Sequence, residues 1–115
     1  MPNPVVHFEI RGKDKAKLQD FYRQAFGWTV NTDNPMSYGM VAAEDGRGIG
    51  GGVDGDQPGV TVYIEVDDPA AYLEKVKGLG GKVVMDVTVI PNRVTMAQFA
   101  DPEGNVIGIV KSNSM

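Results

Sequence analysis

The chain opens with alternating apolar and polar positions, and the same pattern returns in its second half. Residues 6–10 read Val-His-Phe-Glu-Ile and residues 62–66 read Val-Tyr-Ile-Glu-Val, with Glu at the fourth place of each. Successive side chains of a strand point to opposite faces, so both segments predict strands with one face wholly apolar. We expect the apolar face to pack beneath a helix, and the other face to carry His7, Glu9, Tyr63 and Glu65.

A helical pattern follows each of these strands. In residues 14–26 the apolar positions recur at a spacing of three and four, and the same holds in residues 68–79. Asp14 and Asp68 are typical helix caps, and Gly27 is typical of a helix end. We therefore predict two helices, each with one apolar face, formed by Leu18, Phe21, Tyr22, Ala25 and Phe26 in the first and by Tyr72, Leu73, Val76 and Leu79 in the second.

Three strand-like runs follow each helix, separated by turn residues such as Asp45-Gly46 and Pro91-Asn92. The two halves share one order at an offset of 56 residues at the start (6 to 62) and 58 at the end (49 to 107). The sequence predicts an α+β fold of two tandem βαβββ modules in a single domain, residues 1–115. The expected strands after the helices are 28–30, 38–43 and 49–53, then 82–89, 94–100 and 106–111; the modules are about 5–53 and 60–111, with a linker at about 54–59.

Composition narrows the function classes. The chain has no cysteine, which excludes a disulfide framework and a thiol nucleophile. Its net charge of −4 argues against nucleic acid as a partner. No apolar run reaches the length of a membrane span, and residues 1–4 lack the pattern of a signal peptide. We expect a cytoplasmic protein with no membrane partner.

Two related modules enclose a cleft in which equivalent positions of both meet, so we expect the binding site there. Alternation places eight side chains on the sheet face away from the helices. Phe99 is expected to face the core, so Met96 and Gln98 should face the other way. Their counterparts 58 residues earlier, Tyr38 and Met40, should lie on the same face. The predicted lining is His7, Glu9, Tyr38, Met40, Tyr63, Glu65, Met96 and Gln98. The run Gly50-Gly51-Gly52 predicts a place where backbone or ligand approaches closely.

The repeated βαβββ unit, the opening VVHFEI, the IGGG stretch and the ending FADPEGNVIGIV resemble the vicinal oxygen chelate superfamily. This superfamily includes glyoxalase I, bleomycin-resistance proteins and extradiol dioxygenases, and the chain is most similar to small bacterial proteins related to lactoylglutathione lyase. The resemblance covers about residues 5–111. It implies a concave sheet that forms a binding cleft, a homodimer and, for an enzyme, lyase- or isomerase-like chemistry.

The resemblance also implies where a metal would bind. In metal-using members the ligands stand on the first and last strands of each module, which correspond here to His7, Gly50, Tyr63 and Gly108. Only His7 is a good ligand among them. We therefore predict no metal site and no other cofactor.

Three function classes follow for a small organic ligand. The first is binding or metal-independent catalysis, with His7, Glu9 and Glu65 as candidate catalytic groups and Tyr38, Met40, Tyr63, Met96 and Gln98 as substrate-binding walls. The second is a metal-dependent lyase, isomerase or dioxygenase with a shifted ligand set, such as His7, Glu9 and Glu65. The third is antibiotic sequestration in an acidic cleft.

Structural roles are the alternative for the polar residues. His7 would then be a hydrogen-bonded sheet residue, and the two Glu residues would form ion pairs with Arg47, Arg93 or a lysine. A vestigial cleft in a protein that acts through protein partners is the remaining reading, and nothing positive in the sequence supports it.

Overall fold

The structure, a computed structural model of the 115-residue chain, describes residues 2–90 and 94–112. The chain forms two compact units. We call residues 7–61 the N-terminal unit, and residues 62–115 together with 1–6 the C-terminal unit. Strands β1 (Val5–Gly12) and β5 (Gly59–Val66) each contribute to both units.

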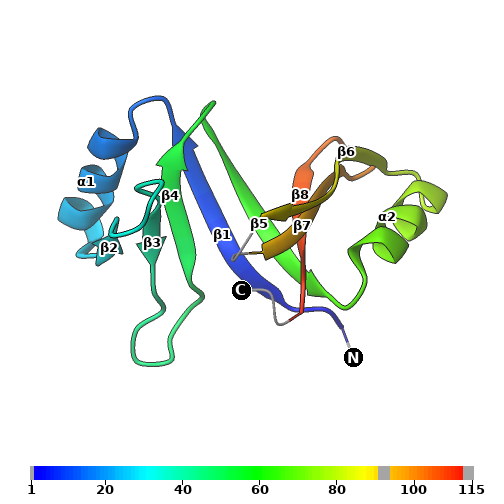
Figure 1. The fold of residues 1–115 in the computed structure, drawn as a ribbon, viewed down its shortest axis with the longest axis horizontal. Coiled ribbons are helices and arrows are strands. Elements are labelled where there is room, and N and C mark those ends of the chain that lie inside the picture. Colours follow the sequence, from blue (N-terminus) through cyan, green and yellow to red (C-terminus); the bar gives the residue numbers. More distant parts are fainter. Residues whose placement is uncertain (1, 91–93, 113–115) are drawn as a thin grey trace. The chain divides into compact units, whose positions relative to one another are not determined.

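The N-terminal unit is a mixed sheet with one helix against it (Figure 1). After β1 come α1 (Lys15–Phe26), β2 (Val30–Asn31), β3 (Gly39–Val41) and β4 (Gly51–Gly55). The strands lie in the order β2-β3-β4-β1. The pair β1–β4 is parallel, whereas β2–β3 and β3–β4 are antiparallel.

The C-terminal unit repeats this arrangement. After β5 come α2 (Pro69–Gly78), β6 (Lys82–Ile90), β7 (Val94–Ala100) and β8 (Val106–Lys111). The order is β5-β8-β7-β6, again with the first and last strands parallel and the other pairs antiparallel. The predicted α+β fold with repeated βαβββ units is confirmed, while the predicted Pro91-Asn92 turn lies outside the described residues.

Short-range chemistry fixes the ends of both helices as predicted. The Asp14 carboxylate accepts a hydrogen bond from the Lys17 backbone N–H at 3.1 Å, and the Asp68 carboxylate accepts one from the Ala71 N–H at 3.3 Å. Each cap satisfies a backbone donor that the helix leaves unpaired. Gly27 ends α1 in the left-handed conformation, with φ of 69°.

Each unit buries its own apolar cluster between helix and sheet. The predicted helix-side positions Phe8, Ile64 and Val66 all belong to these clusters, which confirms the alternation. The cluster of the N-terminal unit centres on Val30, Val41 and Val53, and that of the C-terminal unit on Val66, Leu73, Ala97 and Ile109.

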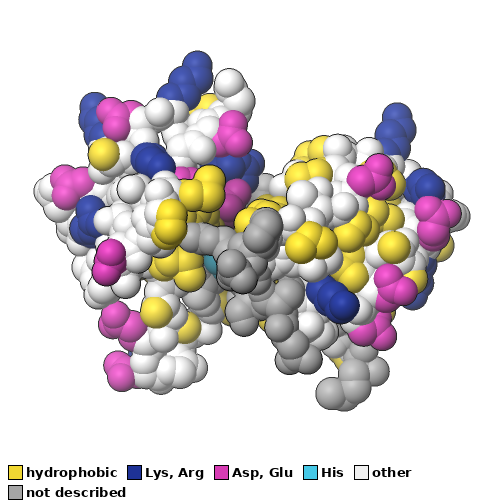
Figure 2. Space-filling view, viewed as in Figure 1, with side chains coloured by type: hydrophobic (Ala, Val, Ile, Leu, Met, Phe, Trp, Pro, Cys, Tyr) yellow, Lys and Arg dark blue, Asp and Glu magenta, His cyan; other side chains and the backbone are white. Residues whose placement is uncertain are grey.

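The predicted helix faces are too wide. Phe21, Phe26 and Leu79 are 57%, 66% and 71% exposed. In α1 the buried residue is instead Gln19, whose amide donates hydrogen bonds to the Val53 carbonyl at 2.9 Å and the Ser37 carbonyl at 3.3 Å. The strands β2 and β3 are only two and three residues long, so they offer little sheet surface to the end of α1. Figure 2 shows the resulting mixture of hydrophobic and charged side chains on the surface.

Some strand boundaries also differ from the prediction. The expected strand at 38–43 is limited to β3, and the expected strand at 49–53 is displaced to β4. Between them Asp45 and Gly46 both have positive φ, 56° and 68°, as a tight hairpin turn requires. Strands β4 and β5 extend into the expected linker, since one ends at Gly55 and the other begins at Gly59.

Neither α1 nor α2 has both the length and the apolar character needed to cross a membrane, and the described ranges 2–90 and 94–112 contain no other candidate helix.

Candidate functional site

On the face of β1 opposite Phe8, four hydrogen bonds join five polar side chains, which we call the polar chain. His7 Nε2 lies 3.1 Å from the Tyr38 hydroxyl oxygen, and that hydroxyl donates to Glu9 Oε2 at 3.2 Å. The Arg11 guanidinium donates to Glu9 Oε1 at 3.2 Å and to the Thr61 hydroxyl at 3.0 Å. His7, Glu9 and Arg11 share this face because they alternate along one strand.

The bonding of Tyr38 determines where the protons lie. An ionised carboxylate only accepts hydrogen bonds, so the Tyr38 hydroxyl gives its one proton to Glu9. The Tyr38 oxygen then accepts from His7, which assigns the proton of a neutral imidazole to Nε2. Burial lowers the pKa of His7 below its ordinary value of 6.5, which favours that neutral form.

Glycines let aromatic rings lie flat on the sheet. A Cβ at Gly52 would come within 1.7 Å of the Tyr38 hydroxyl, and a Cβ at Gly51 within 2.4 Å of the Phe8 ring. The close approach predicted for the glycine run is therefore made by the protein's own side chains, Phe8 on the helix side and Tyr38 on the other.

The predicted residues of the C-terminal unit also share one face of their sheet. Gln98 and Tyr63 both lie opposite Gly108, and the Gln98 amide donates to the Tyr63 hydroxyl at 3.0 Å. Tyr63 is only 3% exposed, and its ring covers Gly108, where a Cβ would come within 2.2 Å. One row further on, Glu65 and Met96 both lie opposite Val110.

The structure thus brings together His7, Glu9 and Tyr38 in one unit, and Tyr63 and Gln98 in the other. Met40, 47% exposed, lies in register with Gly52, which in turn lies in register with Glu9. The predicted cleft that draws on both modules stays a prediction.

Glu9 forms an ion pair with Arg11, which was not among the alternatives Arg47, Arg93 or a lysine that the sequence suggested. The partner stands two residues along the same strand, where the alternation of residues 7, 9 and 11 could have indicated it. Thr61, which is buried at 2% exposure, had no such signal. Arg93, the other arginine considered as a partner, lies outside the described residues.

The side chains do not fit the metal site that the resemblance implies. The Phe8 N–H bonds to the Gly50 carbonyl, so His7 stands beside a residue with no side chain. In the other unit the Tyr63 ring fills the place above Gly108. Across residues 2–90 and 94–112, no three His, Asp or Glu side chains form a group that could hold a metal ion.

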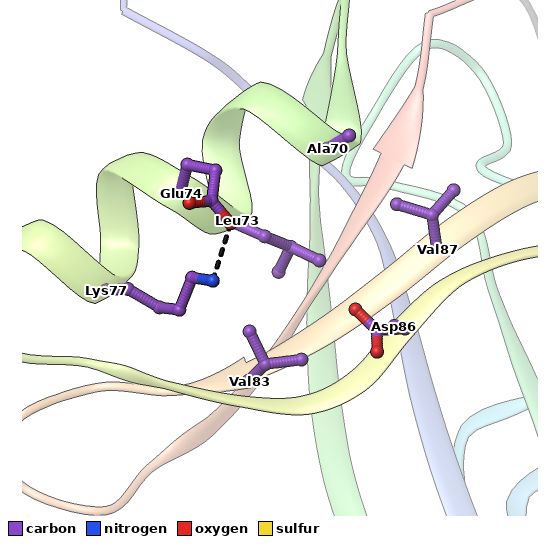
Figure 3. Close-up of a pocket in the computed structure, with 7 residues that line it drawn as sticks. All are labelled: Ala70, Leu73, Glu74, Lys77, Val83, Asp86 and Val87. Atoms are coloured by element: carbon purple, nitrogen blue, oxygen red, sulfur yellow. Dashed lines mark ion pairs between the residues drawn. The ribbon is translucent and has the colours of Figure 1, made fainter.

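A cavity of about 270 Å³ lies between α2 and β6 (Figure 3). Leu73, Val83 and Val87 give it apolar walls, and Glu74 forms an ion pair with Lys77 beside it. The hydrogen bond from Lys77 to Glu74 raises the pKa of Lys77. None of the predicted site residues lines this cavity.

Comparison with known families agrees with the repeated fold. The model of the Glyoxalase/Bleomycin resistance protein/Dioxygenase superfamily matches residues 5–109. The chain belongs to this superfamily. "Putative glyoxylase CFP32" of Mycobacterium tuberculosis and its counterpart in Mycobacterium bovis are each 29% identical to it over 116 aligned positions. The match covers 91% of this chain but only 44% of those proteins, so the chain spans less than half of their length.

Several solved structures share the fold at low sequence identity. A methylmalonyl-CoA epimerase in complex with methylmalonyl-CoA and NH4+ is 16% identical, with a TM-score of 0.69 over 99% of this chain and 97% of the epimerase. The epimerase of Mycobacterium tuberculosis gives a TM-score of 0.67 at 15% identity, over 93% and 86%. A superfamily member from Vibrio splendidus 12B01 gives 0.65 at 18%, over 96% and 100%. These likenesses establish the fold.

Proposed function

We propose that this superfamily member binds a small organic molecule on the sheet face that carries the polar chain, without a metal ion. The observation that carries the proposal is the series of side-chain hydrogen bonds that links His7 to Tyr38, Tyr38 to Glu9, and Glu9 to Arg11. Polar and charged side chains are costly on a partly buried face, and here their mutual hydrogen bonds hold them in fixed positions. Met40 adds an exposed apolar contact on the same face.

The same series suits proton transfer. A neutral imidazole accepts a proton, while Tyr38 and Glu9 hold the ring and stabilise the imidazolium that results. In a turnover reaction of the lyase or isomerase class, His7 would serve as the base and the carboxylate of Glu9 as its electrostatic support. Glu65, Tyr63, Met96 and Gln98, which share one face of the C-terminal unit's sheet, stay predicted site residues.

A ligand screen by thermal shift tests the proposal, followed by titration of the best hit against His7→Ala, Glu9→Gln and Tyr38→Phe. Each variant removes one link of the polar chain, and we expect each to weaken binding. If the hit is turned over, His7→Ala should lower the rate on the order of a hundredfold or more. The exposed Glu103→Gln is the matched control for the loss of a carboxylate. Unchanged affinity and rate in all three variants would place the site elsewhere.

Sequestration of an antibiotic is the second function considered for this face. Glu9 gives this face acidic character, although its carboxylate already forms an ion pair with Arg11. A cationic ligand that binds tightly and is recovered unchanged would identify sequestration, whereas chemical conversion of the ligand would identify an enzyme.

We also propose that the chain is a cytoplasmic homodimer. Small members of the superfamily that it resembles commonly pair, and the chain has exposed apolar side chains such as Val84 and Val89 on β6. Sedimentation at micromolar concentration should give twice the 12.4 kDa chain mass. A monomer alone under these conditions would contradict the proposal.

A further inference from the structure

The N-terminal unit contains a second cavity, of about 330 Å³, which we call the aromatic cavity. Its lining includes the apolar side chains of Phe8, Phe26, Trp28 and Ile49 and the charged residues Glu44 and Arg47. Phe8 points to the helix side of β1, whereas His7 and Glu9 point to the other side. The aromatic cavity is therefore separate from the polar chain.

The walls suit a flat apolar molecule. The Phe26 and Trp28 rings have centroids 6.1 Å apart at an angle of 36°, and the Phe8 and Trp28 rings lie 5.6 Å apart at 54°. Phe26 is 66% exposed and Ile49 is 41% exposed, so both present apolar surface that a ligand could cover. An aromatic ring placed against Phe26 and Trp28 gains both this burial and ring contacts.

The lining of the aromatic cavity also carries two opposite charges. Glu44 and Arg47 face each other across the two-residue turn, and their backbones form a bridge. In the part of the chain that the structure describes, neither side chain forms an ion pair or a hydrogen bond. The Arg47 guanidinium is planar, and its paired N–H groups match the two oxygens of a carboxylate.

We propose that the aromatic cavity binds a small planar aromatic carboxylate, with its ring against Phe26 and Trp28 and its carboxylate on Arg47. Arg47 provides the attraction, and Glu44 on the opposite side of the turn opposes the negative charge. Neutralising Arg47 should therefore weaken the binding of the carboxylate, whereas neutralising Glu44 should strengthen it.

Trp28 is the only tryptophan of the chain, so its indole N–H gives one signal that reports on this cavity. The experiment titrates benzoate into the protein and follows that signal by NMR, with benzamide as the uncharged analogue and cyclohexanecarboxylate as the non-planar one. We expect saturable shifts with benzoate and weaker binding of both analogues. No shift with benzoate up to about 10 mM, or equal binding of benzamide, would overturn the proposal.

Two neutral variants of similar size complete the test. Arg47→Gln should weaken benzoate binding roughly tenfold, since a hydrogen-bonded charge is lost. Glu44→Gln should strengthen binding, because it removes a repulsion of the carboxylate. Lys13→Gln, which removes an exposed positive charge outside the cavity, is the control and should leave the affinity unchanged.

The remaining signals of each spectrum verify that the variant is folded. Unchanged affinity in Arg47→Gln, or weaker binding in Glu44→Gln, would contradict the assignment of the carboxylate to Arg47.

Discussion

At the scale of the residue, His7 is the member of the polar chain whose charge is easiest to follow, since it is the one histidine in the whole sequence. Its imidazole is bonded to Tyr38, whose hydroxyl is held by Glu9. Burial disfavours the charged imidazolium and lowers the pKa of His7. The residue is thus held in the form that can take up a proton.

This lowered pKa predicts a pH dependence of stability. Between the pKa of the folded protein and the ordinary value of 6.5, the unfolded chain binds more protons at this position than the folded chain does. The free energy of unfolding therefore rises with pH through this interval and falls as the solution is acidified below 6.5. Urea unfolding of the wild type and of His7→Gln, between about pH 5 and pH 8, measures the difference. The same pH dependence in both proteins would contradict the assignment.

At the scale of the element, the glycines of β4 determine how Tyr38 reaches the polar chain. Gly52→Ala would place a Cβ against the Tyr38 hydroxyl, so the ring must move and its bonds to His7 and Glu9 must break. We expect a loss of about 1–3 kcal/mol in the free energy of unfolding. Gly78→Ala in α2 is the matched control, because apart from its chain neighbours and the backbone of the helix no atom lies within 4 Å of the added methyl group.

Alanine is a better helix former than glycine, and this control should be neutral or stabilise by up to about 1 kcal/mol. Urea unfolding of both variants gives the comparison. Equal effects of the two substitutions would mean that Tyr38 does not depend on Gly52.

The elements show what the sequence could predict. Helix ends were predictable because the Asp14 and Asp68 caps act over three residues. Strand faces were predictable because alternation is local, and it placed His7 and Glu9 correctly opposite Phe8. The exposure of Phe26 was not predictable, since helical spacing does not show how much of a helix face the sheet covers.

In the candidate site, too, features set by local patterns were predictable, whereas contacts between residues distant in the sequence were not. Alternation predicted His7 and Glu9, but Arg11 was missed. The hydrogen bonds between His7 and Tyr38 and between Arg11 and Thr61 join residues 31 and 50 positions apart in the chain. Similarly, the glycine run indicated a close approach without indicating that Tyr38 and Phe8 are what approaches. The contacts that Phe8 and Tyr38 make over Gly51 and Gly52 arise from the register of β3 and β4 against β1, which no local pattern encodes.

At the scale of the whole molecule, the repeated unit and the family match establish a glyoxalase-type superfamily member, but one fold serves many reactions. Two of the metal positions that the resemblance implies hold glycine, at Gly50 and Gly108. We therefore predict that dialysed protein keeps no stoichiometric Ni, Zn, Fe or Mn, as measured by elemental analysis. About one equivalent per chain that is lost in His7→Ala would contradict this prediction.

The central claim is that the polar chain contacts the ligand, and the imidazole signals of His7 in a carbon-proton correlation spectrum test it most directly. The measurement is a titration with the best hit of the ligand screen, in the wild type and in Tyr38→Phe. We predict saturable shifts of the His7 signals in the wild type and weaker binding in Tyr38→Phe. A ligand that saturates the protein while leaving the His7 signals unmoved would contradict the claim.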